Sequence, residues 1–167
     1  MQDLIKQLEK RYSKKISNFN EVDWYCVSRY DILSEEFIRE YQNKVHWDYI
    51  STFQLLSEDF IREFQDKLDW VCISINQKLS ENFIREFQHK VTWFWISRFQ
   101  KLSEDFIREF QDKVDWVGIT TNQKLSEVFI REFQDKVDWD WISQFQLLSE
   151  DFKKEFKHKI KVYLGGF

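Results

Sequence analysis

The side chains that could bind a ligand or a partner recur in pairs along the chain. The sequence repeats every 23 residues, and each repeat carries one pair whose two members are four residues apart. From the second pair on, large aromatic pairs alternate with small or polar pairs, so the aromatic pairs recur every 46 residues. The pairs are Cys26/Tyr30, Tyr49/Phe53, Cys72/Asn76, Trp95/Phe99, Gly118/Asn122 and Trp141/Phe145. Residues four apart share one helix face, so each pair forms one patch if its segment is helical.

Three interpretations of this alternation stay open. In the first, each large aromatic residue packs over the small residue of the adjacent repeat and fills space. In the second, the aromatic pairs form a ridge that docks a protein partner or a second copy of the chain. Its candidate interface residues are Tyr49, Phe53, Trp95, Phe99, Trp141 and Phe145. In the third, clefts between repeats hold a planar, nucleotide-like ligand, with candidate residues Asn76, Asn122, Trp95 and Trp141.

Two further series recur in the repeats, and the sequence favours structural roles for both. The tryptophans offer stacking surfaces for bases, but Trp70 shares its face with Ile73 and follows Leu68 by two residues, which predicts a core position. That series is Trp24, Trp47, Trp70, Trp93, Trp116 and Trp139. The arginines follow a glutamate by four residues, which predicts surface ion pairs instead of a binding site for a polyanion. They are Arg39, Arg62, Arg85, Arg108 and Arg131, and Glu63 with Lys67 has the same spacing.

A catalytic centre needs residues that occur once, and the chain has few of them. The recurrent serine has no histidine and aspartate in a triad-like arrangement. His89 and His158 share a place in the repeat three copies apart, and His46 lies elsewhere in it, so a histidine metal site is not expected. The sequence also has no glycine-rich phosphate loop and no CxxC or HExxH motif. We therefore predict no enzyme activity, no cofactor and no metal.

The repeat LSEDFIREFQDKVDWxxISxxQK predicts two short helices. Ser57 is a good N-cap before acidic residues, and a first helix is expected over about 58–67. Asp69 is a second N-cap, before a helix over about 70–78. The residues at the place of Asp69 in the other repeats are Asp23, His46, Thr92, Asp115 and Asp138. One long helix is excluded, because 23 residues advance it about 140° beyond whole turns and its apolar face would spiral around the rod.

The fold class is therefore all-α, an α-solenoid of 23-residue helix–turn–helix repeats with degenerate capping units. A single repeat domain is expected over 1–167, because proline is absent and only three glycines occur. Residues 1–33 form an N-terminal cap and a degenerate unit, 34–148 five full repeats, and 149–167 a C-terminal capping helix. Cys26 and Cys72 are expected to be small buried thiols, too far apart for a disulfide.

Charge and hydropathy limit the partners. The net charge is −4, yet the first 15 and the last 17 residues each carry five basic and two acidic side chains, which leaves about −10 for the middle. An acidic middle makes nucleic acid an unlikely partner. No apolar run is long enough to span a membrane, and the N-terminus has no signal-peptide core. We expect a soluble, cytoplasmic protein with no membrane contact.

The segment LSEDFIREFQDKVDW with the following WxxIS resembles short aromatic repeats in hypothetical proteins of giant amoebal viruses and large phages, over about residues 24–152. The resemblance transfers no functional residue. It implies a place in the host cytoplasm and makes antagonism of a host factor a hypothesis. The expected function is a non-enzymatic scaffold that binds a protein partner, or itself, through the aromatic ridge. The alternative is a sponge for a small molecule or nucleotide signal.

Overall fold

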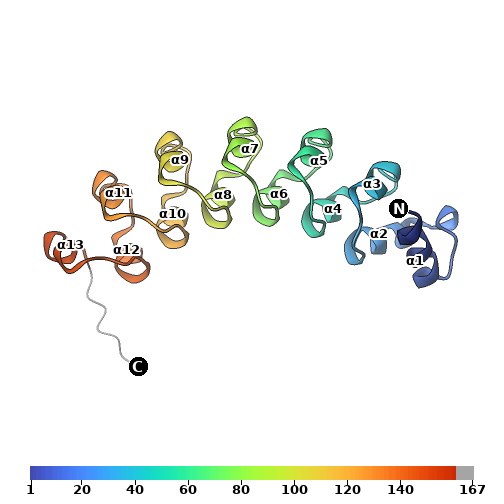
Figure 1. The fold of residues 1–167 in the computed structure, drawn as a ribbon, viewed down its shortest axis with the longest axis horizontal. Helices are drawn as coiled ribbons and strands as arrows, with labels where there is room; N and C mark the ends of the chain where they lie inside the picture. The colour runs from blue at the N-terminus through green and yellow to red at the C-terminus, as the bar shows by residue number, and fades with distance from the viewer. Residues whose placement is uncertain (161–167) are drawn as a thin grey trace, which may run out of the picture. The chain divides into compact units, whose positions relative to one another are not determined.

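The computed structural model describes residues 1–160, and all regular structure within them is helical (Figure 1). The part before the first full repeat holds α1 (Gln2–Tyr12), the 3-10 helix η1 (Ile16–Asn18) and α2 (Glu21–Tyr30). The first helices of the following repeats are α3 (Glu35–Glu40), α5 (Glu58–Glu63), α7 (Glu81–Glu86), α9 (Glu104–Glu109), α11 (Glu127–Glu132) and α13 (Glu150–Glu155). The second helices are α4 (Trp47–Phe53), α6 (Trp70–Asn76), α8 (Trp93–Phe99), α10 (Trp116–Asn122) and α12 (Trp139–Phe145).

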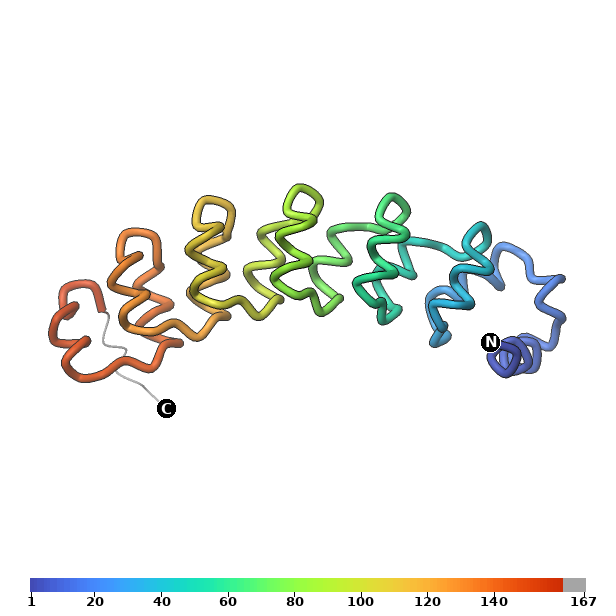
Figure 2. Tube along the Cα trace, turned by 45° about the horizontal axis from the view of Figure 1, so that its top comes forward, coloured from blue at the N-terminus to red at the C-terminus, as the bar shows by residue number. Residues whose placement is uncertain are grey.

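The chain divides into two compact units, Met1–Leu79 and Ser80–Phe167. In the first unit α2 packs against α4 and α4 against α6; in the second, α8 packs against α10 and α10 against α12. Figures 1 and 2 show, within each unit, the second helices in one row and the first helices in another. Each unit is thus a helical-repeat solenoid, which confirms the predicted fold class. The predicted C-terminal cap is partly seen as α13, and its residues 161–167 lie outside the described residues.

The first helix of each repeat is shorter than predicted. Ser57 caps α5 as expected, because its side chain accepts the Phe60 N–H, but the helix ends at Glu63 and not near residue 67. A helix that continued to residue 67 would need the Lys67 N–H to bond the Glu63 carbonyl. The Lys67 N–H donates instead to the Phe64 carbonyl at 2.9 Å, which is the tighter spacing of a turn. Beyond this turn the Asp69 N–H donates to Ser51 Oγ and the Gln65 carbonyl accepts from the Trp70 indole, so the chain is held in position for the second helix.

The second helix begins as predicted in most repeats. Asp69 accepts hydrogen bonds from Val71 and Cys72, although α6 ends at Asn76, two residues earlier than expected. Asp115 and Asp138 cap α10 and α12 in the same way. His46 and Thr92 lie at the N-cap without a side-chain capping bond. The prediction for Asp23 is wrong: α2 begins at Glu21 after the N-cap Asn20, and Asp23 is the third residue of a capping box.

Phenylalanine and isoleucine of the first helix, with isoleucine of the second, form the core. Fully buried examples in one repeat are Phe60, Ile61 and Ile73. Among the tryptophans Trp24 is buried, whereas the other five at its place are only half-buried. Trp47 shows the arrangement: its ring packs on Phe64 with 5.0 Å between ring centroids, and its indole N–H donates to the Gln42 carbonyl in the turn between the helices. The predicted core position therefore holds fully for Trp24 alone.

The two cysteines are less buried than predicted. Cys26 and Cys72 are free thiols, but both are half-buried, not buried as predicted. The Cys72 sulfur lies 3.2 Å from Thr52 Oγ1. Across residues 1–160 we find no helix with the length and apolar character to cross a membrane.

Candidate functional site

Within each unit, a glutamine after the second helix fixes that helix against the preceding one. Gln54 lies just after α4; its Nε2 donates to the carbonyls of Ser28 and Asp31 at 3.1 and 2.8 Å, and its Oε1 accepts the Leu33 N–H at 2.9 Å. The same place holds Gln77, Gln100, Gln123 and Gln146. Sequence reasoning missed this ladder, although the recurrence of glutamine at one repeat position was the available signal.

A hydroxyl at the middle of the second helix adds a further tie. Ser28 Oγ donates to the Trp24 carbonyl at 2.8 Å and accepts the His46 N–H at 2.9 Å, so α2 holds the start of α4. In the second unit Ser97 and Thr120 make the equivalent contacts. Within each unit, the second helices are therefore placed by bonds to main-chain groups of their neighbours, which leaves their outer side chains free to vary.

The arginine series is structural, as predicted, and has an additional contact. Arg108 pairs with Glu104 and Asp105 of its own helix and with Glu132 of the next repeat, whose Oε2 lies 2.8 Å from its Nε. The hydrogen bond to Glu132 raises the pKa of Arg108. The guanidinium also lies over the Phe129 ring. These contacts leave it poorly suited to hold a polyanion.

The predicted partner of Lys67 is wrong. Lys67 does not bond Glu63. It donates to Gln42 Oε1 at 2.7 Å and lies over the Trp47 ring, and both of these residues belong to the preceding repeat. Glu63 accepts from Arg39 instead. The sequence separation of these contacts is 24 or 25 residues, so a pattern of neighbours along one helix could not have indicated them.

The six ridge residues form three aromatic patches, each on one helix face. Ring centroids are 6.1 Å apart in Tyr49/Phe53, 5.6 Å in Trp95/Phe99 and 5.5 Å in Trp141/Phe145. The second member of each pair is the more open: Phe53, Phe99 and Phe145 are 51, 56 and 53% exposed. Tyr49 and Trp95 are half-buried, and Trp141 is exposed. The outer rings are thus available to a partner.

The nearest neighbours of Gly118 are not aromatic side chains. A Cβ on Gly118 would lie 2.9 Å from the Arg98 Cγ and 2.9 Å from Asp115 Oδ2. Arg98 crosses from α8 to form an ion pair with Asp115 and stacks 3.5 Å from the Phe94 ring centroid. At Gly118, therefore, an arginine lies closest to the small residue, and this contact does not support the interpretation that an aromatic residue packs over it.

In the first unit, Tyr25 and Arg29 of α2 partly cover the aromatic pair Tyr49/Phe53. Arg29 Nη1 donates to the Tyr25 hydroxyl at 2.8 Å, and its guanidinium lies over the rings of Tyr49 and Phe53. Tyr25 and Tyr49 meet edge to face with centroids 4.9 Å apart. The hydrogen bond with Tyr25 raises the pKa of Tyr49. Contacts within the protein therefore cover part of the Tyr49/Phe53 pair, which leaves less of its surface for a partner.

The asparagines of the alternative site are engaged with their own helices. Asn76 Nδ2 donates to the Cys72 carbonyl, and Asn122 Nδ2 donates to the Gly118 carbonyl, both at 3.1 Å. Asn122 lines a hollow with Lys101, Leu102, Gln123 and Lys124. Trp141, the aromatic wall expected beside Asn122, lines a different hollow with Asp138, Asp140 and Gln144.

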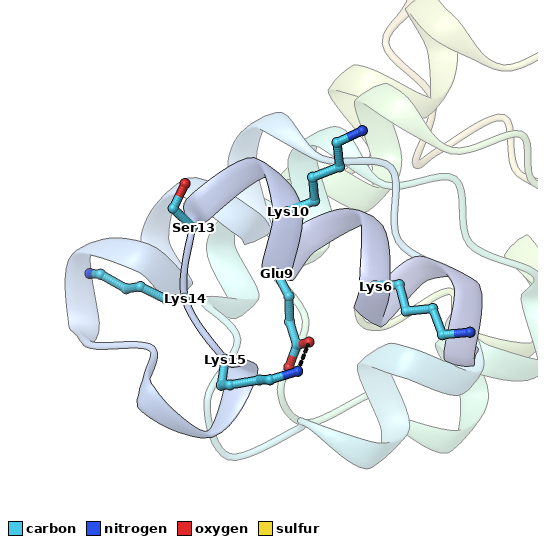
Figure 3. Close-up of a pocket in the computed structure, with 6 residues that line it drawn as sticks. All are labelled: Lys6, Glu9, Lys10, Ser13, Lys14 and Lys15. Atoms are coloured by element: carbon cyan, nitrogen blue, oxygen red, sulfur yellow. Dashed lines mark hydrogen bonds and ion pairs between the residues drawn. The ribbon is translucent and has the colours of Figure 1, made fainter.

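A basic hollow in the N-terminal cap is the other candidate. Figure 3 shows its lining residues, Lys6, Glu9, Lys10, Ser13, Lys14 and Lys15. Lys15 bonds Glu9 at 2.9 Å and lowers the pKa of that carboxyl, and Lys14 bonds Asp23 at 2.9 Å. The ammonium groups of Lys6, Lys10 and Lys14 point in different directions (Figure 3). The lysines do not converge on one point, so the hollow is a poor anion site.

No set of three or more histidine, cysteine, aspartate or glutamate side chains in residues 1–160 is arranged to hold a metal ion. Comparison of the chain with protein-family models, with curated proteins and with solved structures gives no match. The aromatic ridge of the second unit is therefore the candidate surface that the geometry favours.

Proposed function

We propose that the chain is a non-enzymatic scaffold that binds a protein partner through the aromatic ridge. One observation carries the proposal: every second repeat presents a phenylalanine at the end of its second helix with about half of its surface in water. Covering about 100 Å² of such a ring contributes about 2.5 kcal/mol at most. Several rings along one surface give a protein interface its apolar centre.

The alternation within the chain supplies substitutions that the fold accepts. Phe99 and Phe145 occupy the place that Asn76 and Asn122 hold in the other repeats. The double variant Phe99→Asn/Phe145→Asn should therefore fold and should lose the partner. The readout is the native mass of the protein purified from cells with its partners retained.

Val128→Asn is the matched control, because Val128 is an exposed apolar residue of α11 in the same unit and lies outside the ridge. It should leave the partner bound. The proposal fails if the double variant keeps the same native mass and the same partners while only its melting temperature falls. If the resemblance to viral repeats holds, the partner is a host factor.

A nucleotide signal is the second candidate, since Asn122 lies in a hollow with the basic side chains of Lys101 and Lys124. A ligand present at a hundred times its dissociation constant adds about 2.7 kcal/mol to the free energy of unfolding. A thermal-shift screen over cyclic and linear nucleotides tests this candidate. Absence of a shift over the whole set removes it.

A further inference from the structure

Two adjacent hollows lie along the edge of the second unit where its second helices end. The first is lined by Lys101, Leu102, Asn122, Gln123 and Lys124. The second is lined by Lys124, Leu125, Phe145, Gln146 and Leu147. Lys124 belongs to both, so the edge runs from two basic side chains to an aromatic ring and a leucine. None of the lining side chains is acidic.

These two lysines differ from most other cations of their unit. Lys113 and Lys136 bond glutamines of the preceding repeat and lie over tryptophan rings, and Arg108 has three carboxylate partners. Within residues 1–160, Lys101 and Lys124 make no hydrogen bond or ion pair, and both are exposed. In a chain of net charge −4, two unpaired lysines beside one another leave an uncompensated positive patch.

The apolar end of the edge is equally open. Leu147 is 98% exposed and Phe145 53%. The place of Leu147 is held by Lys101 and Lys124 in the two preceding repeats, so the chain itself changes from charge to apolar surface along this edge. A surface with this order fits a segment that carries carboxylates first and an apolar side chain after them.

We propose that the partner docks on this edge with an extended acidic segment that ends in an apolar residue. Its carboxylates pair with Lys101 and Lys124, and its apolar side chain covers Phe145 and Leu147. Packed helices lie about 10 Å apart, and three residues of an extended chain span about 10 Å. The fitting pattern is therefore two acidic residues three apart, with an apolar residue three further on. The proposal rests on the proposed function and specifies the chemistry of the partner.

The test measures binding of two fluorescent polymers by anisotropy at low ionic strength, with the full chain. A random copolymer of glutamate and tyrosine supplies both charge and apolar groups, and polyglutamate supplies charge alone. The wild-type chain should bind the copolymer more tightly than polyglutamate. Lys101→Glu/Lys124→Glu should weaken copolymer binding about tenfold, because two favourable charge pairs become repulsive.

Two further variants locate the effect. Phe145→Ser/Leu147→Ser should weaken binding of the copolymer and leave polyglutamate unchanged. Lys157→Glu is the matched charge control, because Lys157 is an exposed lysine of the same unit away from this edge; it should change affinity less than about twofold. Thermal unfolding checks that each variant is folded, which is expected because Leu55 and Leu147 already occupy the place of these lysines.

Four results would overturn the proposal: no binding of the copolymer by the wild-type chain, equal weakening by Lys157→Glu, no weakening by Lys101→Glu/Lys124→Glu, or equally tight binding of oligothymidylate that the same two lysines control. The last result would indicate a nucleic-acid ligand. If Phe99→Asn/Phe145→Asn releases the cellular partner and the lysine variant does not, only the acidic chemistry is wrong and the scaffold function stands.

Discussion

Tyr49 in the first unit and Trp141 in the second occupy the same place of the repeat, but their surroundings differ. Tyr49 meets Tyr25 edge to face and lies under the Arg29 guanidinium. Trp141 packs on Phe145 of its own helix and is 36% exposed. The difference lies in the preceding second helix: Tyr25 and Arg29 of α2 cover Tyr49, whereas the ring contact of Trp141 is within its own helix.

The first prediction concerns the ladder that holds both regions. Gln54→Ala should lower the free energy of unfolding by about 3 kcal/mol, because three buried main-chain groups of the first unit lose their partner. Gln146→Ala, at the half-buried last rung of the second unit, should lower it by about 1 kcal/mol. Urea denaturation gives both values. Equal losses would contradict the view that the interior and the end of the stack differ.

The second prediction tests what keeps the place beside Trp141 small. Gly118→Leu should destabilise the fold by about 2 kcal/mol, since its Cβ already meets Arg98 and Asp115. Arg98→Ala in the Gly118→Leu background should recover about 1 kcal/mol by removing the Cγ that clashes. A double-mutant cycle measured by urea denaturation checks this. Additive effects of the two substitutions would show that Arg98 does not set the size limit.

The third prediction bears directly on Tyr49 and Trp141. Tyr49→Cys and Trp141→Cys each introduce the residue that Cys26 and Cys72 hold at this place. Tyr49→Cys should destabilise by about 2 kcal/mol, because it removes the ring contacts to Tyr25 and Arg29. Trp141→Cys should cost about 1 kcal/mol, because its ring has fewer contacts. Thermal melts under reducing conditions give the stability loss of each variant. A larger loss for Trp141→Cys than for Tyr49→Cys would contradict the comparison of the two residues.

The smallest predicted effect is a pH dependence at the last repeat. The backbone N–H of Ser149 bonds Glu127 at 2.6 Å and lowers the pKa of that carboxyl below its ordinary value of 4.5. A lowered folded-state pKa contributes stability above pH 4.5 that is lost as the pH falls through the folded-state value. Glu127→Gln should therefore melt slightly lower than the wild type at pH 7, with the gap closing as the pH falls below 4.5. A constant gap would assign the effect to packing.

The sequence predicted the repeat, the N-caps Ser57 and Asp69 and the ion pairs of the arginines, because each depends on residues a few positions apart. Helix ends were harder, since the Lys67 N–H bonds the Phe64 carbonyl in a turn and the Trp70 indole then bonds the Gln65 carbonyl. Two features depend on which side chains of adjacent repeats meet: the contact of Arg98 with Gly118, and the lack of a partner for Lys101 and Lys124 within residues 1–160. No spacing along the chain reports such contacts, so the ridge was found from the sequence and its basic edge was not.

The glutamine rungs have a consequence for how such a chain can change. Gln54, Gln123 and Gln146 bond peptide groups of the preceding repeat, which every copy offers whatever its outer side chains are. Whole 23-residue cassettes are therefore interchangeable at their junctions, and adding or deleting one should preserve the joints on either side. Aromatic and polar pairs alternate from repeat to repeat. One added repeat would therefore place two pairs of the same kind next to each other, whereas two added repeats would keep the alternation.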